Sequence, residues 1–174
     1  MLDVIKTRRS HRKFLQKEVE PEKLEELLRA AFYAPSSKSL KPWEFIVVRH
    51  KELKEGLSRA SLYSRFVKDA PLIIVICYDT TKNRRFKEDS SIAAAMISLE
   101  AENQGLGTCF VQVAEAYEAD VGDTEGYVKR LLNIPNNYRV QCLLPIGYPA
   151  VKLPPKTDDE IEQHKVHNET FGSR

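Results

Sequence analysis

The stretch LIIVICY, residues 72–78, decides the fold class of this chain. It follows Pro71 and carries no charged residue. Its length and its β-branched content favour a central strand that is covered on both faces of a sheet. Working outward from this strand, the sequence predicts three further strands, at residues 44–49, 108–113 and 140–146.

Helical patterns alternate with these strands. Pro21, with an acid on either side, suits the first turn of a helix and the polarity of its dipole. Leu24, Leu27 and Leu28 then fall on one face of that helix. The predicted helices cover residues 4–9, 20–31, 51–59, 89–104 and 124–132. Helices mixed with strands in this way predict an α+β fold in three layers, with helices on both sides of a sheet.

The helix predicted at residues 89–104 is apolar over most of its girth. Ile92, Met96 and Leu99 line one side, and neighbouring alanines widen the apolar face. A helix of this kind is buried on several sides. It therefore belongs in the middle of the domain or between two subunits.

The composition describes one globular domain. The chain has 174 residues, of which 42% are apolar and 30% charged. These values are ordinary for a soluble protein, and the length allows a core without disulfides or metals. The net charge of +2 gives no general case for nucleic-acid binding. The chain has neither a GxGxxG fingerprint nor a P-loop sequence.

The cysteines stand far apart among apolar neighbours, at Cys77, Cys109 and Cys142. Their odd number and wide spacing argue against a disulfide framework or a zinc site, so each is expected to be a small buried residue. The first ten residues are polar and charged, unlike a signal peptide, and the apolar runs are too short to cross a bilayer. We expect a cytoplasmic protein without a metal, a membrane or a nucleic-acid partner.

Basic residues gather in the first 13 positions, where five lysines and arginines stand against one acid, Asp3. Three guanidiniums and a hydroxyl there can hold a phosphate, because an arginine fork matches phosphate oxygens bidentately. These residues, called the arginine block below, are Arg8, Arg9, Ser10 and Arg12. A basic surface turn would give the same pattern. The second basic stretch, KNRRFK at residues 82–87, is interpreted as a solvated face.

A hydroxyl-rich loop, called the serine loop below, covers residues 35–42 between a predicted helix and a predicted strand. Pro35 and Pro42 fix its backbone at either end. Such a loop can aim backbone groups and small hydroxyls at a planar polar ligand, although an ordinary connection would look similar. Trp43, the only tryptophan, is expected in the core.

Five sequence blocks, taken in order, resemble the nitroreductase family. The first two are RRSHRKF at residues 8–14, against the pattern RRSxRxF, and APSSKSLKPWEF at residues 34–45, against APSxxNxQPWxF. The others are GLGTCF at 105–110, LPIGYP at 144–149 and VHNETFG at 166–172. Each block alone is weak, but the set spans nearly the whole chain.

The resemblance implies a three-layer α+β fold over residues 1–174, with a mixed or antiparallel central sheet flanked by helices. It implies a homodimer that binds one FMN at each of two sites, built from both subunits across the interface, with the tail, about residues 150–174, extended over the partner. The residues that match cofactor positions are Arg8, Arg9, Ser10, Arg12, Pro35, Ser36, Ser37, Ser39, Gly107 and Lys156. Those expected to face the substrate are Lys41, Phe110 and Tyr117.

The resemblance also implies an activity, in which reducing equivalents pass from NADH or NADPH through flavin N5 to a small aromatic, quinone or nitro acceptor by a ping-pong mechanism. A reductase with a narrow substrate, such as a dehalogenase or an enone reductase, is one alternative. An FMN-binding protein without turnover is another. The flavin supplies the chemistry, so no catalytic side chain is assigned. The histidines are interpreted as surface residues: His11, His50, His164 and His167.

Three departures from the family pattern bear on the site. Ser39 stands where the family has Asn, and Lys41 stands where it has Gln. After Lys156 the chain has Thr157-Asp158-Asp159 in place of a second basic residue. The acidic segment 115–126 is interpreted either as a lid over the flavin or as a plain surface loop.

Overall fold

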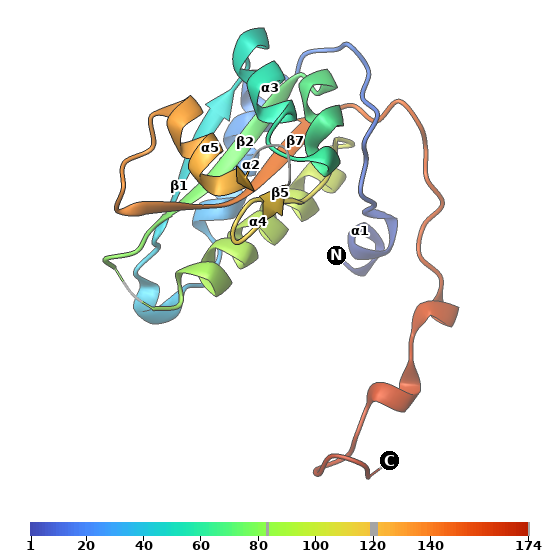
Figure 1. The fold of residues 1–174 in the computed structure, drawn as a ribbon. Coiled ribbons are helices and arrows are strands. Elements are labelled where there is room, and N and C mark those ends of the chain that lie inside the picture. Colours follow the sequence, from blue (N-terminus) through green and yellow to red (C-terminus); the bar gives the residue numbers. More distant parts are fainter. Residues whose placement is uncertain (83, 119–121, 174) are drawn as a thin grey trace.

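A single antiparallel sheet forms the centre of the molecule in the computed structural model, which describes residues 1–82, 84–118 and 122–173 (Figure 1). Strand β2 lies between β1 and β7, and the short strands β3 and β4 both pair with β7. The strands are β1 (Trp43–Val48), β2 (Leu72–Asp79), β3 (Gly107–Thr108), β4 (Val111–Gln112) and β7 (Tyr138–Gly147). The predicted sheet and its antiparallel pairing are confirmed.

Strand β2 is buried along its entire length, as its apolar sequence predicts. Its side chains alternate between two hydrophobic cores, with Ile74 and Ile76 on one face and Ile73 and Val75 on the other. Such burial removes apolar area from water on both faces of the sheet and is the main favourable term in its stability.

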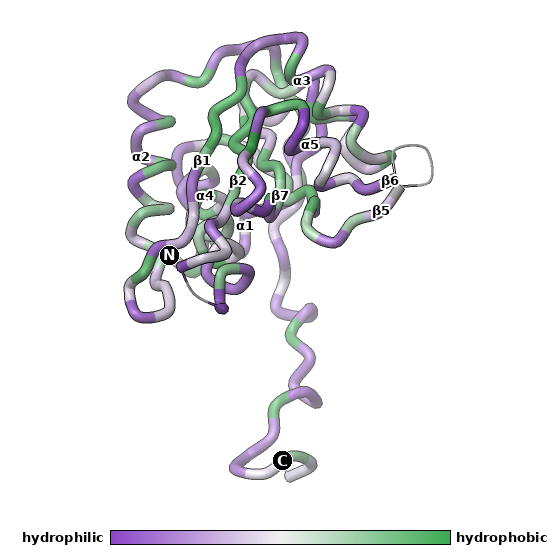
Figure 2. The backbone as a smooth tube through the Cα atoms, turned by 60° about the vertical axis from the view of Figure 1, so that its left-hand side comes forward, coloured by the Kyte–Doolittle hydropathy of each residue, from purple (hydrophilic) through white to green (hydrophobic). Residues whose placement is uncertain are grey.

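Helices cover both faces of this sheet and make the three layers. The first core lies under α2 (Pro21–Phe32) and α4 (Phe86–Asn103). The second lies under α3 (Lys51–Ser58), the 3-10 helix η2 (Leu62–Asp69) and α5 (Thr124–Leu132). Figure 2 shows α2 to one side of the strands and α5 to the other.

The remaining elements lie at the margins of the domain. Helix α1 (Leu2–Thr7) contacts α4, and the 3-10 helix η1 (Ser37–Ser39) belongs to the serine loop. A small hairpin joins β5 (Tyr117–Glu118) to β6 (Gly122–Asp123). The C-terminal tail carries the 3-10 turns η3 (Asp158–Glu160) and η4 (Gln163–Lys165) and runs away from the body of the domain (Figure 1).

The strand predicted at residues 108–113 is interrupted, and this prediction is partly wrong. Its two pieces, β3 and β4, pair with β7 in one continuous register, which places Pro145 opposite Cys109. Proline has no N–H to donate to a ladder, so the pairing breaks where the two residues meet. The helix η2 was not predicted from the sequence.

The three cysteines are free and buried, as expected from their apolar neighbours. Burial raises the pKa of Cys77 to about 12 and raises that of Cys142 well above its ordinary value. Neither thiol is therefore ionised at neutral pH. Trp43 is also in the core, with 2% of its surface exposed.

Candidate functional site

The arginine block is held against the edge of the sheet by backbone pairing with β3. Ser10 forms an isolated parallel bridge with Thr108, and the N–H of His11 donates to the carbonyl of Thr108 at 2.9 Å. Gly107 allows this approach, because a Cβ there would lie 2.8 Å from Cγ of His11. The Gly-rich block at 105–110 and the arginine block, far apart in sequence, thus lie side by side.

Side chains of the arginine block affect the pKa of the Cys109 thiol. Burial raises the pKa of this thiol, while the nearby positive charges of Arg12 and Arg8 and a hydrogen bond from Ser10 act in the opposite direction. Arg12 also lies over the ring of Phe66, with Cζ 6.0 Å from the centroid. Two guanidiniums and a hydroxyl therefore gather around one short stretch of backbone, and this donor chemistry fits a phosphate group.

Arg9 turns toward the C-terminal tail, where its guanidinium donates to the carbonyl of Pro154. Lys156 reaches the same region through its backbone, since its N–H donates to the carbonyl of Lys6 at 2.9 Å. Its ammonium pairs with Glu160 at 3.4 Å and does not join the arginine block within this chain. The tail thus crosses α1 on its way out of the domain.

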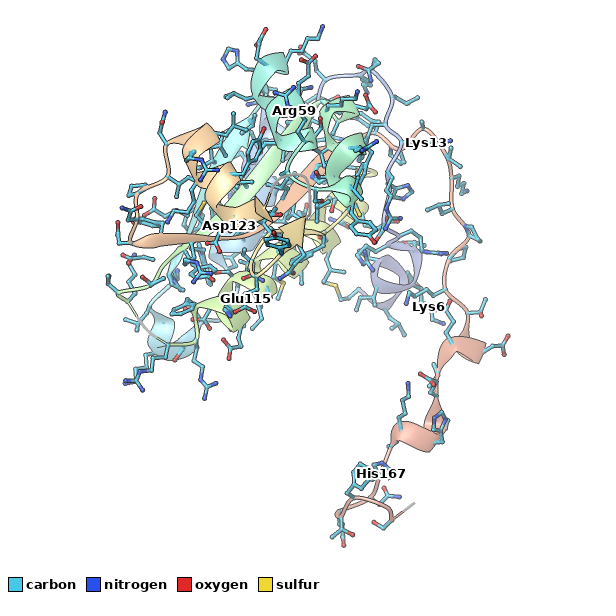
Figure 3. All side chains as sticks on the ribbon, in the orientation of Figure 1. Lys6, Lys13, Arg59, Glu115, Asp123 and His167 are labelled. Atoms are coloured by element: carbon cyan, nitrogen blue, oxygen red, sulfur yellow. The ribbon has the colours of Figure 1, made fainter. Side chains whose placement is uncertain are left out.

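Asp158, one of the departures from the family pattern, has a partner on α1. Its carboxylate accepts a hydrogen bond from Lys6 Nζ at 2.6 Å, and Figure 3 shows Lys6 directed toward the tail. The hydrogen bond and the charge of Asp158 raise the pKa of Lys6. Asp158 therefore fastens the tail to α1.

His11 is buried, with 7% of its surface exposed, so its interpretation as a surface residue is wrong. Its ring packs against Gly107 between the arginine block and the sheet edge. Burial lowers the pKa of His11, and the charges of Arg9 and Arg8 add to this effect while Glu102 opposes it. His50, His164 and His167 are not buried.

The serine loop is held at the N-terminal end of α4. The N–H of Ser37 donates to Asp89 Oδ1 at 3.0 Å, and the N–H of Lys41 donates to Ser36 Oγ, also at 3.0 Å. Asp89 is 4% exposed, which is unusual for a carboxylate and indicates that this contact is part of the fold. Sequence reasoning missed Asp89, because it looks like an ordinary acid in a first helical turn.

The backbone of the serine loop is in a conformation that L-residues rarely adopt. Lys38, Ser39 and Lys41 have φ values of 52°, 55° and 43°. Non-glycine residues in the left-handed region are uncommon and cluster at ligand-binding loops. Pro35, Ser39 and Lys41 are exposed, while Ser36 and Ser37 are half-buried.

The two sets of predicted cofactor residues, the arginine block and the serine loop, lie near different positions along the axis of α4. The serine loop contacts Asp89, whereas the arginine block meets β3, where Thr108 Oγ1 lies 3.4 Å from Ser98 Oγ. Asp89 and Ser98 are nine positions apart on α4, which is about 13 Å along a helix axis. Within one chain the two sets, called the two half-sites below, are therefore separated along α4.

The predicted substrate residues also lie apart. Phe110, which follows Cys109 in sequence, is 42% exposed, and Tyr117 is 76% exposed on the hairpin. Of the acidic segment predicted as a lid or loop, residues 119–121 lie outside the described residues, as does Asn83 of the KNRRFK stretch.

Gln141 organises the segment that links β4 to this hairpin. It is the extra residue of a bulge in β7, and its carbonyl accepts the N–H groups of Val113 and Ala114 at 3.2 Å each. Its side-chain amide donates to Ser91 Oγ on α4 at 3.1 Å. Bulges are frequent beside active sites. Sequence reasoning missed Gln141, although a polar residue inside an apolar strand is a visible signal.

Two expected absences can be examined within the described ranges. No group of three or more histidine, cysteine, aspartate or glutamate side chains among residues 1–82, 84–118 and 122–173 could hold a metal ion. Within the same ranges, every helix is too short or too polar to cross a membrane.

Comparisons with known proteins identify the family of this chain. A candidate NADH dehydrogenase/NAD(P)H nitroreductase from Methanothermobacter thermautotrophicus is 36% identical over 174 residues, which cover 98% of this chain and 87% of that protein. The solved structure of an FMN-dependent nitroreductase from Clostridium difficile superposes with a TM-score of 0.95 at 42% identity, covering 98% of this chain and 100% of that one. An iodotyrosine deiodinase from Thermotoga neapolitana is 24% identical over 187 residues, covering 92% of this chain and 95% of that protein.

The model of the Nitroreductase family matches residues 5–64 and 57–148. These ranges contain the arginine block, the serine loop and all strands of the central sheet. By sequence, fold and the order of its site residues, this chain belongs to the nitroreductase family.

Proposed function

We propose that this protein is a homodimeric, FMN-dependent oxidoreductase that passes reducing equivalents from NADH or NADPH to a small aromatic, quinone or nitro acceptor. The observation that carries the proposal is the separation of the two half-sites along α4. A second copy of the chain would supply the serine loop that one arginine block lacks. The names of two relatives, an FMN-dependent nitroreductase and a candidate NAD(P)H nitroreductase, support the same cofactor and co-substrate.

An apolar stripe on α4 supports the dimer. Ile92 is 37% exposed, Ala95 is exposed, and Met96 and Leu99 are half-buried on the same side of the helix. These positions follow the i, i+3, i+4, i+7 spacing of one helix face. A face of this kind on the longest helix of the domain suits an interface between copies, because burying it removes apolar area from water.

Within the proposed dimer, each set of residues has a separate task. The arginine block holds the phosphate with charge-assisted hydrogen bonds, as its guanidiniums and hydroxyl allow. The serine loop offers backbone N–H groups and hydroxyls to the edge of the ring system, and Phe110 and Tyr117 offer aromatic faces to the acceptor. When bound, FMN would supply the hydride and electron chemistry that no side chain of this protein can perform.

A ping-pong order belongs to the proposal, because one exposed ring face would serve both the nicotinamide and the acceptor in turn. The relative named as an iodotyrosine deiodinase favours a second candidate, a reductive dehalogenase within the same family. The two functions share the cofactor and differ only in the acceptor.

The test is the visible spectrum of the purified protein, before and after anaerobic addition of NADH or NADPH. We expect flavin absorption that bleaches with one or both nicotinamides and returns with a nitroaromatic, a quinone or an iodotyrosine. The acceptor that restores the absorption fastest identifies the reaction. A colourless protein that fails to take up added FMN would exclude the proposal, and a coloured protein that no nicotinamide bleaches would support a binding protein without turnover.

A further inference from the structure

Four exposed cations lie on two neighbouring loops near the N-terminal end of α4. Lys38 and Lys41 belong to the serine loop, and Lys82 and Arg84 belong to the turn between β2 and α4. We call these four residues the basic rim. Figure 1 shows η1 beside the first turn of α4, so the two loops border the same part of the surface.

Two hydrogen bonds fix the serine loop against α4 and β2, the elements that the other loop connects. The N–H of Ser37 donates to Asp89 Oδ1 at 3.0 Å, and the N–H of Asp79 donates to the carbonyl of Pro42 at 2.9 Å. One contact lies at each end of the serine loop. The spacing of the rim cations is therefore built into the fold.

The neighbouring acids leave the basic rim with a positive surplus. Asp79 and Asp89 are 9% and 4% exposed, and both accept hydrogen bonds from backbone N–H groups of these loops. Glu88 pairs with Arg85 at 3.2 Å, and Glu115 pairs with Lys87. The basic rim therefore has four exposed positive charges, whereas the two carboxylates beside it are buried. Among the described residues, no carboxylate forms an ion pair with a rim cation.

Two of the rim cations belong to the serine loop itself. Lys38 lies three positions before Lys41. Both are in the left-handed region, with φ values of 52° and 43°, and both are exposed. The loop that the proposed function brings to the flavin therefore carries two positive charges.

We propose that the basic rim selects an anionic co-substrate, through either the 2′-phosphate of NADPH or the carboxylate of an acceptor. This inference rests on the proposed function, because it needs the serine loop to border the flavin site. Exposed charges act on a ligand over roughly 8–10 Å at moderate salt, which raises the rate of productive encounter. The rim therefore raises kcat/KM for the anionic member of a matched pair of substrates.

The experiment compares the wild type with Lys38→Gln/Lys41→Gln in two matched pairs. The first pair is NADPH against NADH with a neutral acceptor, and the second is 4-nitrobenzoate against 4-nitrobenzyl alcohol with NADH. We expect the double variant to lower the anionic-to-neutral ratio of kcat/KM by about 3–10-fold in one pair, and added salt to have the same effect on the wild type. The pair that responds tells the phosphate from the carboxylate.

The control is Lys51→Gln/Arg130→Gln, which removes two exposed positive charges from α3 and α5. It is expected to leave both ratios within about twofold of the wild type, because surface charges beyond a Debye length are screened. Unchanged ratios in the rim variant, or an equal change in the control, would overturn the inference while leaving the proposed function intact. A wild type that oxidises neither nicotinamide would overturn both.

Discussion

His11 is the most deeply buried residue of the segment 8–12, although arginines stand on both sides of it within that segment. Its place between Gly107 and the arginine block explains why its ring is out of water. A histidine among arginines is thus a packing residue here.

The burial of His11 predicts a pH dependence of stability. The folded pKa lies below the ordinary value of 6.5, so the unfolded chain binds a proton first as the pH falls. Stability should therefore be unaffected by His11 above pH 6.5 and should decrease as the pH falls below it, until the folded pKa is reached. His11→Gln should flatten this part of the curve, measured as the free energy of unfolding in urea between about pH 5 and 7.

His50→Gln is the control, because His50 is exposed at the start of α3. Its curve is expected to follow that of the wild type. A His11→Gln curve parallel to that of the wild type would contradict the assignment.

Gly107 offers a second prediction at this scale. A Cβ at this position would lie 2.8 Å from Cγ of His11, which forces one of the two residues to move. Gly107→Ala should cost about 1–3 kcal/mol of stability. His11→Ala should absorb most of that cost in the double variant, so the two changes should not be additive in urea unfolding. Additive costs would show that the obstacle is not the ring of His11.

An ion pair with a buried carboxylate joins α5 to β7. Glu125, 5% exposed, accepts hydrogen bonds from Arg139 Nε at 2.6 Å and Nη2 at 2.7 Å, and from the N–H of Val140 at 2.9 Å. The hydrogen bonds with Glu125 raise the pKa of Arg139. Together with the Val140 bond they join α5 to β7. Glu125 therefore fixes α5 against the sheet.

Glu125→Ala should lower the free energy of unfolding by about 2–4 kcal/mol, because it strands a buried N–H and a partly buried guanidinium. The matched control is Glu25→Ala, which removes the exposed partner of Arg29 on α2. It should cost less than about 0.5 kcal/mol. Equal costs in thermal or urea unfolding would mean that burial does not govern these pairs.

The elements that the sequence predicts well are those with a long or clean apolar pattern. The buried strand β2 and the helix α5 match their predicted ranges to within one residue. Residues 108–113 were predicted as one continuous strand. The prediction is partly wrong because the interruption comes from Pro145, which lies on another strand and gives no signal within residues 108–113. Helix η2 was missed because it is short. Its N-terminal capping box, formed by Ser61 and Ser64, was the signal in the sequence.

In the candidate site, too, some features can be predicted from the sequence and others cannot. The arginine block and the serine loop are visible as composition and spacing within single segments. Their positions along α4 depend on Asp89 and on the bridge between Ser10 and Thr108, which join distant segments. Tertiary pairing of this kind leaves no local signal in a single sequence.

At the scale of the whole molecule, the proposed dimer leads to a prediction about assembly. Ile92→Glu/Met96→Glu places two charges on the apolar stripe of α4. A charge buried in an interface without a partner is costly, so the variant should sediment as a monomer. It should also lose FMN, because each arginine block would lack the serine loop of a partner.

Sedimentation velocity and the absorbance ratio of flavin to protein measure both effects. Asn136→Glu, in the exposed turn between α5 and β7, is the control and should behave as the wild type. A monomer that keeps FMN would show that one chain forms a complete site.

Because the three cysteines are buried, the rate at which a thiol reagent labels each one reports how often the structure around it opens. Cys77 and Cys142 lie in adjacent central strands, 2% and 0% exposed, while Cys109 lies at the sheet edge beside the arginine block, 3% exposed. A thiol reagent can reach the first two only when the sheet comes apart, and the third when the N-terminal segment lifts. Labelling followed by peptide mapping would therefore time two motions in one sample. Phosphate or FMN, added beforehand, should slow the labelling of Cys109 first.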